Sequence, residues 1–250
     1  MTVQTRIARP PQVDLPPTEA RIFHGMWGDL MRLGRLPSAY GILCPLCLKP
    51  KSHDELTLEH IIPKSALAYD PPILRKLHSV NNRSGLTHLC SACNRIKGKW
   101  YDPIIVKMFK KPEFQPSPRE ENKELKARRT LAYLGAFREL GYSYILTSKL
   151  NAVRLDFLHP SRPPTSSGLY FISAGVYRHF PHAYFDGWCD TYDGNGNRTN
   201  SVFACHSDPT SDTVQIRVRH ITVMLPVERQ LIVARKPGTP PNIVFNASLM

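Results

Sequence analysis

The chain of 250 residues is long enough to bury a sizeable core, and its 33 lysines and arginines against 20 acidic residues give a formal net charge of +13. This excess favours a polyanionic partner, either nucleic acid or an anionic membrane surface. No apolar run approaches the roughly 18 residues of a membrane span, and the N-terminal stretch MTVQTRIARPPQVDLPP has no apolar segment typical of a signal peptide. We therefore expect a cytoplasmic protein with no membrane partner.

The N-terminal part predicts an extended leader followed by a helix. Residues 1–17 carry four prolines and little periodicity, so we expect an extended leader without chemistry of its own. From Thr18, a plausible N-cap, apolar residues recur at helical spacing as far as Met31. Gly34 is placed to end this helix, which is expected to pack on the core.

Two Cys-x-x-Cys pairs dominate residues 41–102. The chain has six cysteines, too few for a disulfide framework, and four of them form these pairs, which in a reducing compartment indicates metal. Zinc prefers four N or S ligands in a tetrahedron. A redox pair would not need a second copy, and chance burial would not favour the same spacing twice. We therefore predict a structural zinc site formed by Cys44, Cys47, Cys90 and Cys93.

A further element is expected between the two pairs, because the 42 intervening residues exceed the roughly 15–20 of a simple zinc ribbon. It contains LTLEHIIP (56–63), whose alternation predicts a strand that ends near His60, beside Glu59. Asn94 begins NRIKGKW, which predicts a short helix before Pro103. Zinc would hold this helix against the strand. A carboxylate, an imidazole and an amide would then meet, which is a set able to hold a hard divalent cation and activate water.

The order Cys-x-x-Cys, Glu-His-Ile-Ile-Pro and Cys-x-x-Cys-Asn-x-x-Lys, within residues 41–102, resembles the HNH (ββα-metal) endonucleases that carry a four-cysteine structural zinc. The resemblance implies that His60 is the general base. It also implies that Glu59 and Asn94 hold one catalytic Mg²⁺ or Mn²⁺ ion. The expected activity is hydrolysis of phosphodiester bonds, most simply those of DNA.

This chain departs from the family pattern at two places. Glu59 stands where the family often has Asp, and its longer side chain shifts the expected ion position or weakens the ligand. The middle asparagine, which in the family orients the histidine loop, is absent from its usual place, since Gly85 begins GLTHLC. Asn82, or else Asn81, is the nearest candidate for that part.

Plainer alternatives exist for these residues and for the whole chain. Glu59 and His60 alone would be a surface acid beside a hydrogen-bonded histidine, and Asn94 could simply cap its helix. His88 could contact phosphate or compete for zinc, although a plain strand histidine fits as well. The alternatives to a nuclease are a non-catalytic zinc-stabilised nucleic-acid-binding module and a zinc-organised protein-interaction domain.

The segment after the second cysteine pair is strongly basic. From Asn94 to Thr130 it has 11 lysines and arginines against 5 acidic residues, nearly half of the net charge. Lysines and arginines of this segment are predicted to bind phosphates with salt-sensitive, largely sequence-independent affinity, and those nearest the expected ion are Arg95, Lys97 and Lys99. Residues 119–140 predict an amphipathic helix ending at Gly141, whose charged residues could equally form a solvated face.

The C-terminal half predicts an antiparallel β-rich domain, with runs such as SVFACHS and VQIRVRHITVML separated by turn residues. A hairpin turning at Asn197 would place Cys189 opposite Cys205 as buried thiols. Target recognition, binding of a protein partner and stabilisation are all compatible with this half. The expected architecture is α+β: a leader (1–17), a helix with a zinc-organised HNH unit and a basic helix (18–141), and the β-rich domain (142–250).

Overall fold

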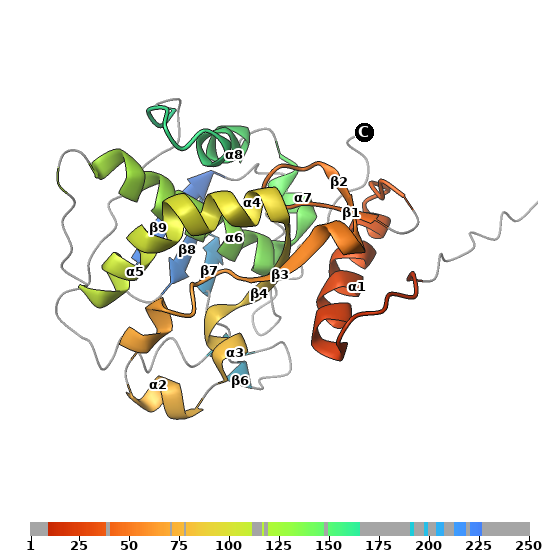
Figure 1. The fold of residues 1–250 in the computed structure, drawn as a ribbon, viewed down its shortest axis with the longest axis horizontal. Helices are drawn as coiled ribbons and strands as arrows, with labels where there is room; N and C mark the ends of the chain where they lie inside the picture. The colour runs from red at the N-terminus through yellow and green to blue at the C-terminus, as the bar shows by residue number, and fades with distance from the viewer. Residues whose placement is uncertain are drawn as a thin grey trace, which may run out of the picture.

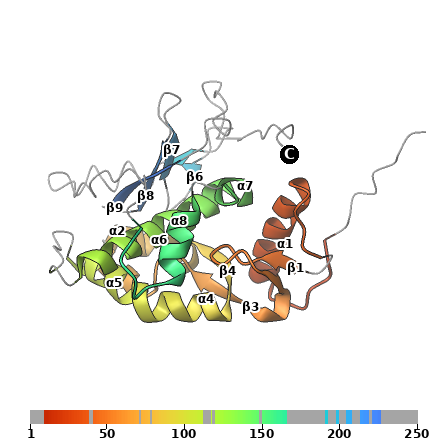
Figure 2. The same cartoon turned by 90° about the horizontal axis from the view of Figure 1, so that it is seen from above.

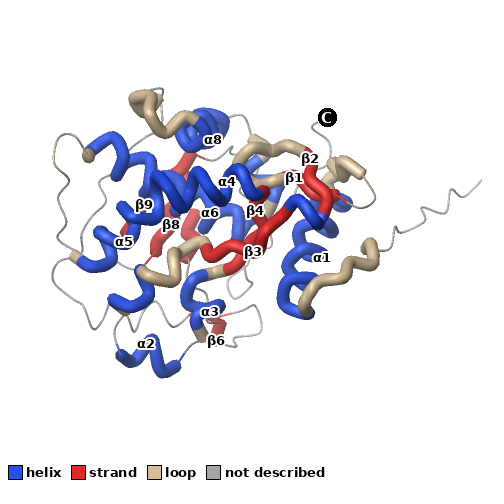
Figure 3. The backbone as a smooth tube through the Cα atoms, viewed as in Figure 1, coloured by secondary structure: helices blue, strands red, loops and turns tan. Residues whose placement is uncertain are grey.

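The structure is a computed structural model that describes residues 10–38, 41–70, 72–77, 79–111, 117, 120–147, 150–165, 191–192, 198–199, 204–207, 213–218 and 221–226. These residues form helices around small antiparallel sheets (Figures 1 and 3). The predicted α+β class is confirmed. Within the described ranges, no helix is both long enough and apolar enough to cross a membrane.

Helix α1 (Pro17–Arg32) begins two residues earlier than expected, with Pro16 rather than Thr18 at the N-cap. Its end follows the prediction. Gly34 adopts a φ of +63°, which glycine tolerates, and the N–H groups of Gly34 and Arg35 donate to the carbonyls of Met31 and Leu30 at 3.0 and 2.9 Å. The helix packs against β1 and β4 through one buried apolar face, made of Phe23, Met26, Trp27 and Leu30.

Two short antiparallel ladders follow α1. Strand β1 (Gly41–Leu43) pairs with β2 (Pro50–Ser52), and a 3-10 turn, η1 (His53–Glu55), leads into β3 (Leu56–His60). The predicted strand that ends at His60 is therefore confirmed. Strand β3 pairs with β4 (Leu86–Cys90), and the register runs from Leu56 opposite Cys90 to His60 opposite Leu86. The connection between them contains η2 (Ala66–Tyr69), α2 (Pro72–Leu77) and α3 (Val80–Ser84).

A long helical run leaves the end of β4. It consists of α4 (Ser91–Ile96), the π-helical turn η3 (Lys97–Tyr101) and α5 (Asp102–Lys110). The helix therefore begins three residues before Asn94 and continues through Pro103, where we expected it to stop. Proline normally clashes with the carbonyl four residues earlier, and here that residue lies in the wider π-helical turn, which relieves the clash.

Helix α6 (Glu121–Leu140) lies in the middle of the molecule (Figure 2). The α4–α5 run lies on one side of it and the β7–β8–β9 sheet on the other, and α7 (Tyr142–Ile145) and α8 (Asn151–Leu158) also pack on it. It ends at Gly141 (φ +76°) as predicted. Because neighbours cover several sides, α6 buries side chains on more than one face and not only along a single apolar stripe. The buried side chains include those of the charged residues Lys126 and Arg129.

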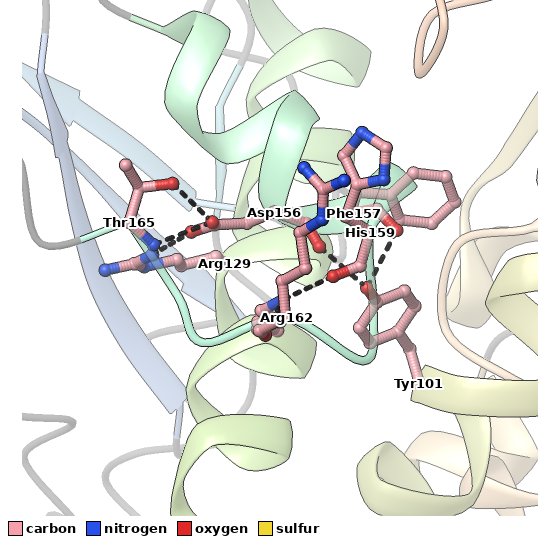
Figure 4. A network of polar contacts seen from close by, with 8 residues as sticks. Tyr101, Arg129, Asp156, Phe157, His159, Arg162 and Thr165 are labelled. Atoms are coloured by element: carbon pink, nitrogen blue, oxygen red, sulfur yellow. Dashed lines mark hydrogen bonds and ion pairs between the residues drawn. The ribbon is translucent and has the colours of Figure 1, made fainter.

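Lys126 and Arg129 are bound inside the protein. They therefore neither form a solvated face nor bind phosphates, which were the two alternatives from the sequence. Arg129 pairs with the carboxylate of Asp156 in α8, and the other oxygen of Asp156 accepts bonds from the N–H and hydroxyl of Thr165 at 2.8 and 2.6 Å (Figure 4). Lys126 donates to two carbonyl oxygens of the loop 159–162, each at 2.7 Å. These contacts fasten α8 and the loop after it to α6.

The same corner holds the end of the π-helical turn. The buried hydroxyl of Tyr101 reaches the carbonyl oxygens of Asp156 and Phe157 at 3.1 and 2.9 Å, and the rings of Tyr101 and Phe157 stack with centroids 5.2 Å apart (Figure 4). Burial raises the pKa of Tyr101, so its hydroxyl stays a neutral donor. The helical run that follows the second cysteine pair is thereby fixed at its middle.

The described C-terminal strands are β5 (Thr191–Tyr192), β6 (Arg198–Thr199), β7 (Ala204–Ser207), β8 (Thr213–Val218) and β9 (Ile221–Pro226). The β5–β6 register centres on residue 195, not on Asn197. Cys205 is paired with Ile216 in the register of β7 and β8, and Cys189 lies outside the described residues. The run predicted over 214–225 forms two strands, β8 and β9, because the chain reverses between Val218 and Ile221. Alternate residues of β8 and β9 join the core beneath α6. The division into domains stays a prediction.

Candidate functional site

The four cysteines of the two pairs meet at one point. Their sulfur atoms all lie within 4.8 Å of one another, and the sulfurs of Cys47 and Cys90 are 3.9 Å apart. Tetrahedral zinc with bonds of about 2.3 Å holds its sulfur ligands about 3.8 Å apart. Cys44, Cys90 and Cys93 are buried and Cys47 is half-buried. The cluster could hold a metal such as zinc, as the spacing predicts.

Each pair is shaped by backbone contacts. In the first, the N–H of Cys44 donates to Lys49 at 3.0 Å, and the N–H of Leu48 donates to Cys44 at 2.8 Å, with Leu48 in the left-handed region at φ +53°. In the second, Cys90 is the N-cap of α4 and Cys93 lies in its first turn. A helix N-terminus favours negative charge, so this position suits thiolate ligands.

Tyrosines of the central helices hold the first pair in place. The hydroxyl of Tyr133 in α6 donates to the carbonyl of Pro45 at 2.7 Å, and that of Tyr142 in α7 donates to the carbonyl of Leu43. Burial raises the pKa of both hydroxyls, which remain protonated donors. The first pair is therefore fixed to α6 and α7, and the N–H of Cys90 points at the sulfur of Cys44 at 3.4 Å.

The protonation of the cluster depends on the crowding of its sulfurs. Hydrogen bonds among the four side chains raise the pKa of Cys44 and Cys93, lower that of Cys90, and lower that of Cys47 to about 6. Without a cation the thiolates must share protons, since four negative sulfurs at this distance repel one another. A divalent metal ion removes that conflict by binding all four as thiolates.

The polar residues of β3 lie on two faces. Thr57 and Glu59 are two residues apart and point to the α4–η3 side, while His60 points to the opposite side, toward α3. Glu59 accepts a hydrogen bond from Lys97 at 3.0 Å, and the same ammonium donates to Asp102 at 2.8 Å. The sequence thus led us to Glu59 but not to its partners.

Lys97 differs from its expected position. We predicted that it would contact phosphate from the helix surface, yet its side chain is 0 % exposed, and two carboxylates bind it. The π-helical turn explains the arrangement, because the N–H of Asp102 donates to the carbonyl of Lys97, five residues earlier, and brings both side chains to one face. Burial raises the pKa of Asp102, and the charge of Lys97 opposes that shift. No α-helical spacing rule would have paired these residues.

Asn94 faces Thr57 from α4. Its amide N–H donates to the hydroxyl oxygen of Thr57 at 3.1 Å, and the hydroxyl of Thr57 donates to the carbonyl of Leu89 at 3.2 Å. Since the single proton of that hydroxyl is already used, Asn94 must present its NH₂ group to Thr57. Its carbonyl oxygen, a hard ligand, then points elsewhere. Asn94 lies within α4 and does not cap it, which excludes that alternative.

His60 is half-buried at the end of β3, and its Nδ1 contacts the hydroxyl of Ser84 at the end of α3. Burial lowers the pKa of His60, the positive charge of Lys64 adds to that effect, and Glu59 opposes it. The imidazole is therefore held in its neutral form over more of the pH range than a free histidine, and a general base must be neutral.

The residue that fills the middle position of the motif stays a prediction. Asn82 and Asn81 both lie in α3. The side chain of Asn81 is exposed, and that of Asn82 is not among the side chains that the structure describes. Ser84 contacts His60, and Gly85, at φ +63°, follows the end of α3. In the sequence, the short polar residue immediately before that glycine was the signal that could have pointed to Ser84.

The remaining predicted contacts differ in exposure. Arg95 and Lys99 are exposed on α4 and η3, with the ammonium of Lys99 5.5 Å from the ring centroid of Trp100. His88 is buried under α1, where its Nε2 lies 3.1 Å from the carbonyl of Glu19. Phosphate contact and competition for zinc are therefore both excluded for His88, which is a plain strand histidine.

Comparison with known proteins adds nothing to the functional assignment of these residues. No family model, no curated protein and no solved structure significantly matches this chain. The assignment therefore depends on the sequence order of the motifs and on the geometry of the four cysteines, β3, β4 and α4.

Proposed function

We propose that the protein is a metal-dependent endonuclease of the HNH type that hydrolyses phosphodiester bonds of DNA. The observation that carries the proposal is a strand–strand–helix unit, β3–β4–α4, with Glu59 and His60 at the end of its first strand and Asn94 on its helix. The four-cysteine cluster lies at the other end of the same strands. This is the order of parts that the resemblance to HNH nucleases implies.

Zinc is the metal that we assign to the cysteine cluster. Four sulfur donors within 4.8 Å of one another suit zinc better than a hard cation, and a closed set of four protein ligands is typical of a structural site rather than a catalytic one. Bound zinc would join the β1–β2 hairpin to the start of α4. It would thereby fix the position of Asn94 relative to β3.

Glu59 and Asn94 are the residues that would hold the catalytic Mg²⁺ or Mn²⁺. Both offer hard oxygen donors from facing elements, and the amide orientation of Asn94 leaves its carbonyl oxygen for a ligand. When bound, the ion supplies charge stabilisation for the phosphate and the departing 3′ oxygen. Lys97 already neutralises Glu59, so an incoming ion must compete with this ammonium, which can stay bound to Asp102.

The protein's own residues supply the proton transfer and the positioning. The neutral imidazole of His60 takes a proton from water through Nε2 as the water oxygen bonds to phosphorus and the bond to the 3′ oxygen breaks. Arg95 and Lys99 are exposed beside the site and are the residues that we expect to bind phosphates of the substrate. Lys97 would act on the site from inside through Glu59, not by contact with the substrate backbone.

The test is nicking of supercoiled plasmid by the purified full chain, with zinc content measured on the same sample. We expect nicking with Mg²⁺ or Mn²⁺ and none after the divalent ion is removed by brief chelation that leaves the zinc bound. Nicking that persists without divalent ion, in protein that retains its zinc, would contradict the proposal. So would the absence of nicking under all divalent ions and DNA forms tested.

A non-catalytic zinc-stabilised nucleic-acid-binding module is the second candidate, and one observation favours it. The carboxylate of Glu59 is already paired with the ammonium of Lys97, so it has a cationic partner without a divalent ion. That candidate predicts salt-sensitive DNA binding, no cleavage with any divalent ion, and unchanged affinity after His60→Ala.

A further inference from the structure

The hydroxyl of Ser84 joins α3 to the proposed base. Its oxygen donates to the carbonyl of Val80 at 2.8 Å, with the carbonyl of Asn81 farther away at 3.3 Å, and it also contacts Nδ1 of His60. A hydroxyl has one proton and a carbonyl can only accept. With that proton directed to Val80, the oxygen of Ser84 presents only lone pairs to His60, so Nδ1 must carry the hydrogen of this contact.

The position of Ser84 is fixed by its surroundings. Its side chain is buried. Its carbonyl accepts a hydrogen bond from the N–H of Ile62 at 2.9 Å, and the carbonyl of the next residue, Gly85, accepts one from the N–H of Ile61 at 3.0 Å. These two bonds continue the β3–β4 ladder past His60, so the histidine and the serine are held by the same backbone pairing. The contact does not depend on a mobile surface side chain.

We propose that Ser84 is a positioning residue that holds His60 in the tautomer with its proton on Nδ1 and thereby leaves Nε2 as the nitrogen that accepts a proton. The catalytic consequence of this inference rests on the proposed function, but the tautomer itself does not. The serine would take the part that the sequence assigned to Asn82, that of orienting the histidine. A neutral histidine whose other ring nitrogen were protonated could not act as a base at that atom.

The direct test is the tautomer of His60, measured by long-range ¹H–¹⁵N correlation on the full zinc-loaded chain labelled with [¹⁵N]histidine. The spectrum is recorded without divalent ion at about pH 8, above the ordinary histidine pKa of roughly 6.5. A His60→Gln sample identifies the signals by their loss. We expect a protonated Nδ1 and an unprotonated Nε2. A protonated Nε2 in the unsubstituted protein would overturn the proposal by itself.

A pair of serine variants separates orientation from local stability. Ser84→Ala should lose the fixed Nδ1–H pattern and lower kcat for nicking about tenfold with KM unchanged, within the roughly 10²–10⁴-fold that general-base catalysis supplies. The matched control is Ser143→Ala, because Ser143 is also buried and its hydroxyl also donates to a nearby backbone carbonyl, that of Leu140 three residues earlier, at 3.1 Å. This control should change neither the His60 signals nor nicking.

The outcomes distinguish this inference from the proposed function. If the spectra follow the expectation while neither protein nicks DNA, the orientation by Ser84 stands and the nuclease proposal fails. If the unsubstituted protein nicks DNA but the His60 signals are the same in Ser84→Ala, the nuclease stands and the assignment to Ser84 fails. Should Ser84→Ala not fold, the tautomer of the unsubstituted protein still decides.

Discussion

The two ends of the β3–β4 ladder differ in how their polar groups are neutralised. They lie about 13 Å apart along the strand, with Cys90 opposite Leu56 at one end and His60 at the other. At the cysteine end, four sulfurs within 4.8 Å of one another have only one another as side-chain partners in the contacts that the structure describes. At the His60 end, Glu59 and His60 each have a side-chain partner, Lys97 and Ser84 respectively.

This difference indicates two distinct dependences on metal. The cysteine end needs a cation to be stable, because its thiolates would otherwise repel one another. At the His60 end, Lys97 pairs with both Glu59 and Asp102, so this end should keep its fold without a divalent ion. A structural metal and a catalytic metal can thus be told apart by whether the fold or only the activity is lost on removal.

The largest effect should come from breaking the cysteine end. We expect Cys93→Ser to release bound zinc and lower the free energy of unfolding by about 4 kcal/mol or more, because loss of a structural metal is among the most destabilising changes. Zinc content and thermal unfolding followed by circular dichroism measure this. Cys205→Ser, in β7 outside the cluster, is the control. Full zinc occupancy in Cys93→Ser would refute the four-cysteine site.

Removing the internal cation should make the His60 end depend on divalent ion as well. Lys97→Met leaves Glu59 and Asp102 unpaired. The cost should be about 2 kcal/mol, below the roughly 3–5 of a fully buried pair because these carboxylates are 17 % and 20 % exposed. Millimolar Mn²⁺ should restore much of this stability by binding the freed carboxylates, and it should bind the variant more tightly than the unsubstituted protein.

Urea unfolding with and without Mn²⁺ measures both effects. Lys99→Met, which removes the same charge from an exposed position two residues away, should unfold like the unsubstituted protein in either condition. Equal Mn²⁺ affinity in Lys97→Met and the unsubstituted protein would show that the ammonium does not compete for Glu59.

Exposed cations should affect DNA binding in a way that the buried one does not. The double variant Arg95→Gln/Lys99→Gln should lower the slope of log affinity against log salt by about 2, near 0.9 for each phosphate that is no longer neutralised. The control is Arg21→Gln/Arg35→Gln, which removes two exposed charges on and just after α1. An equal change of slope in both double variants would mean that binding follows net charge and has no site on α4.

The smallest expected effect is a shift of the acid limb of the pH profile. Burial lowers the pKa of His60, so nicking should persist below the pH of roughly 6.5 at which an exposed histidine is half protonated, and fall at lower pH. The same lowered pKa affects stability, because His60 binds its proton more tightly in the unfolded chain than in the folded one. The free energy of unfolding should therefore decrease as the pH falls through that range. An acid limb at or above 6.5 would contradict this environment for His60.

Sequence was sufficient where the chemistry repeats and insufficient where backbone geometry decides. The two cysteine pairs, the strand ending at His60 and the glycine ends of α1 and α6 could all be predicted, because each depends on local spacing or on a residue suited to one conformation. The pairing of Lys97 with Asp102 could not, because it requires a π-helical turn that no spacing rule anticipates.

The same distinction applies to the middle of the motif and to the charged residues of α6. The order of residues favoured Asn82, and it gave no sign that pairing across the ladder past His60 would bring Ser84 to the histidine. Lys126 and Arg129 look like a solvated face in the sequence, but Asp156 of α8 pairs with Arg129 and carbonyl oxygens of the loop after α8 bind Lys126. Burial of a charge is decided by what packs on the helix, which local sequence does not contain.

The most direct test of the proposed nuclease is plasmid nicking by His60→Ala protein at the same zinc content as the unsubstituted protein, in Mg²⁺ and in Mn²⁺. His24→Ala is the matched control, since His24, on α1, is also a half-buried histidine. Its Nε2 is hydrogen-bonded to the carbonyl of Pro11 at 3.0 Å. We predict a loss of roughly 10²–10⁴-fold in His60→Ala, none in His24→Ala, and equal thermal stability of the zinc-bound proteins. Normal nicking by His60→Ala would contradict the assignment of His60 as the general base.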